Sequence, residues 1–131
     1  MYLLDTHVVL WWFFNDPQLS YRSRAIIEDG EQKLFVSAAS AWEISTKHRI
    51  GKLPKAAEAV DRFEELLRQA RMESLAISMQ HGLLAGSLVS EHRDPFDRMI
   101  VTQAQLEKLA VISADPVFKG FGIEVVWSVS V

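Results

Sequence analysis

Short apolar runs alternate along this chain with longer segments of helical periodicity, and this alternation constrains the fold more than any other feature. Strands separated by helices form mostly parallel sheets with helices on both faces. We therefore expect an α/β protein, a three-layer α/β/α sandwich with about five strands, as a single domain over residues 1–131. The expected strands are residues 2–4, 34–36, 74–77, 111–113 and 123–127.

The segments between these strands carry helix signals of several kinds. Ser20 and Ser78 are good N-caps, Pro95 stands at a favoured first helical position, and either Ser37 or Ser40 starts the helix that ends near Gly51. The clearest amphipathic pattern predicts one helix over residues 56–71. The other expected helices are residues 6–14, 21–28, 79 to about 89, and 95–109.

Acidic residues follow the expected strands. Asp5 comes directly after residues 2–4, and Asp115 follows the strand at residues 111–113. In open α/β sheets, ligands bind in the crevice beyond the carboxyl ends of the strands. Glu43 and Asp97 lie near the beginnings of helices at the same rim. We therefore expect Asp5, Glu43, Asp97 and Asp115 to converge at one edge of the sheet.

Such a cluster needs a counter-charge, because like charges repel and partial burial disfavours ionisation. Mg²⁺ and Mn²⁺ prefer oxygen ligands, and two such ions activate a water and stabilise the leaving oxygen of a phosphodiester. The pattern therefore favours a metal-dependent phosphodiesterase. The chain has no cysteine, which excludes a Cys nucleophile, a disulfide scaffold and a Cys-based metal site.

Each acid also has a purely structural interpretation. Asp5 is a plausible helix cap, Asp115 begins an Asp-Pro turn, and Glu43 suits a solvated helix surface. Capping explains Asp94, which precedes Pro95, and a first-turn acid such as Asp97 favours the helix dipole. We assign Asp97 as the ligand and Asp94 as the cap, with only a weak case for Asp94 as a further ligand.

Four motifs, taken in order, resemble those of the PIN-domain family and of its VapC-type toxins from bacterial toxin–antitoxin pairs. The motifs are Leu4-Asp5-Thr6-His7, residues 37–44 (SAASAWEI), residues 92–98 (HRDPFDR) and Ile112-Ser113-Ala114-Asp115. The resemblance implies a PIN-like fold and an endoribonuclease that depends on Mg²⁺ or Mn²⁺. It also implies Asp5, Glu43, Asp97 and Asp115 as catalytic acids and metal ligands, supported by Thr6 and Ser113. The implied partners are a VapB-type antitoxin, an RNA substrate and a second copy in a homodimer.

The charge of the chain bears on the substrate. The net charge of −3 is not that of a protein that coats nucleic acid. A bound divalent ion reverses the local field, however, and the basic stretch at residues 47–55 would contact phosphates beside it. The alternative interpretation is that this stretch is solvated charge at the end of a helix. The possible RNA contacts are His7, Lys47, Arg49, Lys52 and Arg98.

Several of these residues also suit other functions. Residues 11–14 (WWFF) either stack on bases or belong to the core or a protein interface, and we favour the latter. Receiver and haloacid-dehalogenase domains require further acids near Asp5 that are missing here. A DNA-cleaving PIN-like nuclease and a non-catalytic interaction module remain as alternatives. The apolar run at residues 8–14 is too short to span a membrane, which needs about 20 residues, and we expect a cytoplasmic protein.

Overall fold

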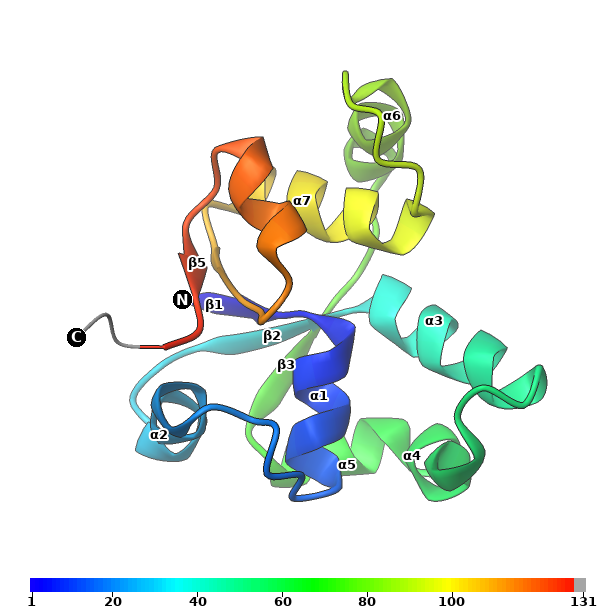
Figure 1. Ribbon diagram of the computed structural model, residues 1–131, viewed down its shortest axis with the longest axis vertical. Coiled ribbons are helices and arrows are strands. Elements are labelled where there is room, and N and C mark those ends of the chain that lie inside the picture. The colour runs from blue at the N-terminus through cyan, green and yellow to red at the C-terminus, as the bar shows by residue number, and fades with distance from the viewer. Residues whose placement is uncertain (129–131) are drawn as a thin grey trace.

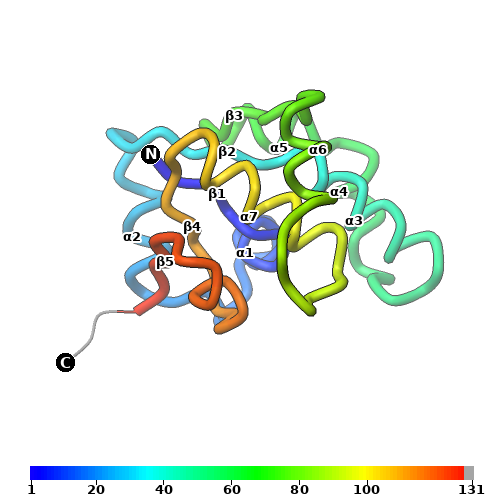
Figure 2. The backbone as a smooth tube through the Cα atoms, turned by 90° about the horizontal axis from the view of Figure 1, so that it is seen from above, coloured from blue at the N-terminus to red at the C-terminus, as the bar shows by residue number. Residues whose placement is uncertain are grey.

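The computed structural model describes residues 1–128, and it confirms the expected α/β sandwich. Five parallel strands form one sheet in the order β3-β2-β1-β4-β5, and Figure 2 shows them following one another in that order. The strands are β1 (Tyr2–Leu4), β2 (Leu34–Ser37), β3 (Met72–Leu75), β4 (Ala110–Ile112) and β5 (Val125–Val126). Nine helical segments connect them within the described residues. These are α1 (Thr6–Phe13), α2 (Tyr21–Asp29), α3 (Ala38–Arg49), η1 (Pro54–Ala56), α4 (Ala57–Asp61), α5 (Phe63–Gln69), α6 (Met79–Ser87), α7 (Pro95–Glu107) and η2 (Pro116–Phe121).

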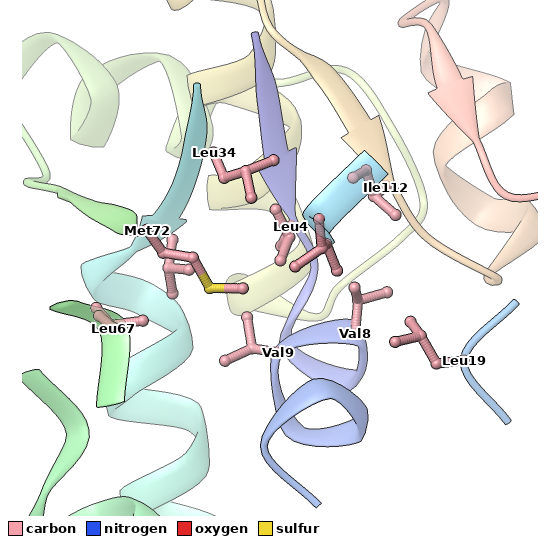
Figure 3. Close-up of a cluster of buried hydrophobic side chains, with 10 residues drawn as sticks. Leu4, Val8, Val9, Leu19, Leu34, Leu67, Met72 and Ile112 are labelled. Carbon is pink, nitrogen blue, oxygen red and sulfur yellow. The ribbon is translucent and has the colours of Figure 1, made fainter. Parts of the chain in front are cut away.

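The sheet separates two apolar clusters, because successive residues of a strand point to opposite faces. Leu4 and Ile112 pack on one face with Val8 and Val9 of α1 and with Met72, as the close-up in Figure 3 shows. Leu3, on the opposite face, packs with residues of α7 such as Ile100. Figure 1 shows α1, α2 and α5 on one side of the sheet and α6 and α7 on the other. This is the three-layer arrangement predicted from the alternation of strands and helices.

The strand order places a topological switch point between β1 and β4. Leu4 pairs with Val36 of β2 on one side and with Ile112 of β4 on the other. The chain leaves β1 toward β2, and it later crosses back to add β4 and β5 on the other side. Crevices of this kind bind ligands outside the carboxyl ends of the strands. Asp5 and Ser113 are the residues that directly follow β1 and β4.

The single helix predicted over residues 56–71 is wrong. The segment divides into η1, α4 and α5, with Arg62 in a non-helical conformation between α4 and α5. The two parts pack on different clusters: Ala56 and Val60 lie against Ile44, whereas Leu67 lies under the sheet with Met72. One straight helix does not pack against both clusters, so the chain bends between them.

Smaller differences concern the ends of elements. Arg71 has a positive φ of 58° and ends the helical segment, so β3 begins at Met72 rather than at residue 74. Lys108, with a φ of 56°, ends α7 before residue 109. β5 covers only the two residues that pair with β4, and η2 was not expected. No helix within residues 1–128 combines the length and the apolar character needed to cross a membrane.

Candidate active site

Asp5 stands at the carboxyl end of β1 and uses both carboxylate oxygens within the protein. Oδ1 accepts a hydrogen bond of 2.9 Å from the backbone N–H of Val8, which makes Asp5 the N-cap of α1. Oδ2 accepts a hydrogen bond from the hydroxyl of Ser113, in the loop after β4. The Ser113 hydroxyl also accepts a bond of 3.0 Å from the N–H of Asp115. Ser113 therefore links the first acid of the predicted cluster to the last.

The surroundings of Asp5 disfavour its negative charge. The residue is 5% exposed, and this burial raises the pKa of the Asp5 carboxyl. The hydrogen bonds from Ser113 and Val8 and the proximity of His7 act in the opposite direction, whereas the charge of Asp115 raises the pKa further. Asp115 is exposed and caps η2 through a 3.0 Å bond from the N–H of Val117. Asp5 and Asp115 thus form one pair of interacting acids.

Glu43 comes from α3, which begins beyond the end of β2. Ser37 is the N-cap of this helix, which decides between the two serines that the sequence left open. The Glu43 side chain is buried and pairs with the ammonium of Lys47, one helical turn further on. The hydroxyl of Thr6 donates a 2.9 Å hydrogen bond to the Ser40 hydroxyl, which joins the first turns of α1 and α3.

Asp94 and Asp97 lie at the N-terminus of α7 and have different surroundings. Oδ1 of Asp94 accepts bonds from the N–H groups of Phe96 (2.9 Å) and Asp97 (3.2 Å), so Asp94 is the helix cap. Asp97 instead accepts a 2.9 Å bond at Oδ2 from Nε2 of His92. Burial raises the pKa of Asp97, and the charges of Asp94 and Glu43 raise it further.

The acids thus form two interacting groups, one of Asp5 with Asp115 and one of Asp97 with Glu43 and Asp94. Within residues 1–128, no three His, Asp or Glu side chains converge closely enough to hold a metal ion as they stand. The donor set nevertheless fits a hard divalent cation. It consists of carboxylate oxygens, and burial and neighbouring acids oppose the ionisation of two of them.

The predicted RNA contacts differ in their surroundings. Arg49 is exposed at the end of α3, while Lys47 is bound to Glu43. His7 and Lys52 line a cavity of about 290 Å³ between α1 and the segment before η1. Arg98 directs its guanidinium at backbone carbonyls, which argues against the predicted RNA contact at this residue.

The aromatic residues that follow the first acid do not face one way. The ring of Trp11 contacts the rings of His7 and Trp127 in tilted arrangements, whereas Phe13 packs edge-on against Phe63. Phe14 is the most exposed of the group and lines the cavity beside Lys52. Trp11, Trp12 and Phe13 are partly buried and pack against the apolar cluster around Leu4.

His92 is the site residue that sequence reasoning missed. It is part of the motif at residues 92–98, but no metal-binding spacing of histidines drew attention to it. Its bond to Asp97 depends on the path of the loop before α7, and a sequence pattern does not reveal that path. A histidine five positions before a predicted ligand was the available signal.

Comparisons with known proteins agree with this architecture. The family model described as PIN domain matches residues 2–123. Over 59 residues, 45% of this chain, the sequence is 34% identical to Ribonuclease VapC16 of Mycobacterium tuberculosis, and the match spans only 42% of that protein.

Two solved structures show the same fold over nearly the whole chain. The structure of VapBC2 from Rickettsia felis bound to a promoter DNA fragment has a TM-score of 0.72 and 18% identity, covering 97% of this chain and 98% of that one. The structure of FitAcB from Neisseria gonorrhoeae has a TM-score of 0.67 and 19% identity, covering 95% and 96%. At these identities the likeness demonstrates the fold.

Proposed function

The chain belongs to the PIN-domain family, and from this premise we propose that it is a metal-dependent endoribonuclease, the toxin of a VapBC-type pair in the cytoplasm. The observation that carries the proposal is the buried Asp5 carboxylate at the end of β1, bound to Ser113 at the end of β4. Burying a carboxylate is costly unless a counter-charge compensates it, and a bound cation would be that counter-charge. The partial match to a protein named a ribonuclease supports RNA as the substrate.

Asp5, Glu43, Asp97 and Asp115 would hold Mg²⁺ or Mn²⁺. When bound, such an ion polarises water for attack on a phosphodiester and stabilises the charge of the leaving oxygen. Asp94 caps α7 in this proposal and stays outside the set of ligands. Burial is the main cause of the raised pKa values of Asp5 and Asp97, and the charges of neighbouring acids raise them further. A cation held by these carboxylates would stabilise their charged forms.

The remaining residues of the site position these acids. Ser113 orients Asp5, and the bond from Thr6 to Ser40 holds α1 against α3, which carries Glu43. Lys47 lowers the cost of burying Glu43 before a metal arrives. His7, Arg49 and Lys52 would bind the phosphates of the RNA. All three are exposed: His7 lies in α1, which Asp5 caps, Arg49 lies in α3, which carries Glu43, and Lys52 follows α3.

A VapB-type antitoxin is the proposed protein partner. The solved structures with this fold include VapBC and FitAB bound to DNA and a toxin-antitoxin complex from Klebsiella pneumoniae. The cavity beside α1 has apolar walls from Trp11, Phe14 and Leu53, a suitable place for an apolar antitoxin side chain.

We also propose a homodimer, because Trp42 and Leu83 expose 60% and 73% of their area.

Cleavage of single-stranded RNA by the purified protein tests the proposed activity. We expect cleavage in Mg²⁺ or Mn²⁺, none in EDTA, and loss of cleavage in Asp5→Asn. Asp61→Asn is the matched control, because Asp61 is an exposed acid of α4 away from the strand ends, and it should cleave like the wild type. Equal activity of wild type and Asp5→Asn, or no wild-type activity with either metal, would contradict the proposal.

Cleavage of DNA instead of RNA would favour the PIN-like DNA nuclease. Antitoxin binding without any cleavage would favour the interaction module.

A further inference from the structure

Arg98, in the first turn of α7, fixes the path of the segment that connects α6 to α7. Its Nε donates a hydrogen bond of 3.0 Å to the carbonyl of Ala85, and Nη2 donates one of 2.7 Å to the carbonyl of Leu88. Nη1 donates to the carbonyls of His92 (2.9 Å) and Ser90 (3.5 Å). The last carbonyls of a helix lack partners within the helix, so Arg98 satisfies the end of α6 and the loop together. One side chain thereby ties residues 85–92 to α7.

His92, in this segment, is restrained on three sides. Its carbonyl accepts the bond from Arg98, and its backbone N–H donates a 3.1 Å bond to the hydroxyl of Ser90. Its ring lies edge-on to the ring of Phe121 in η2, with 6.4 Å between the centroids. The imidazole of His92 therefore has a defined position relative to α7 before any ligand binds.

The restrained imidazole contacts Asp97. Nε2 of His92 lies 2.9 Å from Oδ2 of Asp97, and the two side chains are only 29% and 20% exposed. An ionised carboxylate accepts hydrogen bonds but cannot donate them, so Nε2 carries the proton in this bond. The bond occupies Oδ2, and within residues 1–128 no hydrogen bond is donated to Oδ1. His92 therefore sets the orientation of the carboxylate while one oxygen remains available.

We propose that Arg98 and His92 are positioning residues that act in series, Arg98 holding His92 and His92 orienting Asp97 toward the metal. The inference rests on the proposed function, because it assigns a use to the orientation of Asp97. Carboxylates that bind metals are commonly held by such outer partners, and loss of a partner typically costs about 10–100-fold in metal affinity or activity. Arg98 in this role does not touch the RNA.

The first test uses the metal-free protein and needs no activity. Long-range ¹H–¹⁵N NMR spectra near pH 8 report which ring nitrogen of His92 carries the proton, and His92→Leu assigns the signals. We expect the Nε2–H tautomer in the wild type and a mixture of tautomers in Arg98→Lys, which keeps the charge but cannot reach the same carbonyls. Arg93→Lys is the matched control, an exposed arginine of the same segment, and should resemble the wild type. Identical His92 signals in Arg98→Lys and the wild type would overturn the coupling.

The second test measures Mn²⁺ affinity by calorimetry and RNA cleavage by kinetics. We expect His92→Leu and Arg98→Lys to lose about 10–100-fold in Mn²⁺ affinity and to lower kcat with little change in KM. His92→Gln, whose amide can donate to Asp97, should recover part of the affinity. A raised KM with unchanged kcat in Arg98→Lys would show a direct RNA contact and overturn the proposed role. Wild-type Mn²⁺ affinity in His92→Leu would overturn it as well.

The two tests separate this inference from the proposed function. A wild-type protein that binds no Mn²⁺ and cleaves no RNA contradicts the proposed function, whereas the NMR comparison still decides whether Arg98 places His92 against Asp97. If Arg98→Lys does not fold, the His92 variants still decide the second step. The bonds from Arg98 to Ala85 and Leu88 do not involve the His92 side chain, so those variants retain them.

Discussion

The hydroxyl of Ser113 donates a hydrogen bond to the carboxylate of Asp5, joining the loop after β4 to the end of β1. These residues are 108 positions apart in the sequence. β1 and β4 are neighbours at the point where the strand order reverses, so the bond spans the crevice in which a ligand is expected. The same hydroxyl accepts the N–H of Asp115, and two acids of the proposed site are therefore positioned through one serine.

Replacement of Asp5 by asparagine should stabilise the metal-free protein and abolish cleavage. Burial opposes the ionised carboxylate, and the asparagine amide keeps an oxygen that accepts the N–H of Val8. We expect the melting temperature in EDTA at pH 7.5 to rise by about 2–5 °C, which corresponds to about 1 kcal/mol for a domain of this size. We expect cleavage to fall at least about 100-fold, since loss of even an outer partner costs up to that amount.

Millimolar Mn²⁺ should raise the melting temperature of the wild type and not of Asp5→Asn. A lower melting temperature of the variant in EDTA would contradict this account.

The stability of the metal-free wild type should decrease with increasing pH relative to Asp5→Asn. A carboxyl with a raised pKa binds its proton more tightly in the folded than in the unfolded state. The stabilisation is complete below the ordinary aspartate pKa of about 4 and is lost as the pH rises through the folded-state pKa. Urea unfolding between pH 4 and pH 8 measures this, and the difference between the two proteins should grow toward pH 8. If the difference in the free energy of unfolding is independent of pH, burial does not raise the pKa of Asp5, and this account is contradicted.

Ser113→Ala should destabilise the protein although it removes only one oxygen atom. The variant leaves a buried carboxylate oxygen of Asp5 without its donor, and hydrogen bonds to charged groups contribute about 1.5–3 kcal/mol. Urea unfolding should show a loss of that size at pH 7.5. Ser87→Ala is the matched control, because its exposed hydroxyl donates to the carbonyl of Leu84 and to no other group among residues 1–128, and it should change stability by less than about 0.5 kcal/mol. Equal effects of the two substitutions would contradict the special role of Ser113.

Substitutions of Asp94 that keep or remove the helix cap distinguish its role from that of Asp97. Asp94→Ser retains a capping oxygen and loses the carboxylate, so we expect it to keep both stability and cleavage. Asp94→Ala should lose about 0.5–2 kcal/mol of stability, measured by urea unfolding. If Asp94→Ser folds with unchanged stability and yet loses cleavage, then Asp94 is a ligand and its assignment as a cap alone is incorrect.

Local sequence signals predicted the strands and the helix start that carry the candidate site. The short apolar runs at residues 2–4 and 111–113 identified β1 and β4, and from these runs the sequence predicted that Asp5 and Asp115 lie at one edge of the sheet. The Asp94-Pro95 pair identified the start of α7 because a cap and a first-position proline act locally. The bend at Arg62 was not predictable from periodicity, because the pattern of residues 56–71 suits one helix until the two clusters it packs on are known.

The partners of the acids depend on tertiary structure, and the sequence did not reveal them. Lys47 lies one helical turn after Glu43, a spacing visible in the sequence. The burial of Glu43, which makes the ion pair with Lys47 necessary to compensate its charge, is visible only in the structure. The bond between His92 and Asp97 requires the loop path that Arg98 imposes through carbonyls as many as 13 positions away. Side chains that satisfy distant backbone groups leave no periodic trace in a sequence.

A crystal of the protein grown with Mn²⁺ tests the central claim most directly, because anomalous scattering locates the ion independently of activity. We predict a Mn²⁺ peak beyond the carboxyl ends of β1 and β4, with oxygens of Asp5 and Asp97 as ligands and His92 still bound to Asp97. The peak should be lost in Asp5→Asn. Clear density for these acids without any Mn²⁺ peak at this edge, at millimolar metal, would contradict the claim that they form one metal-binding site.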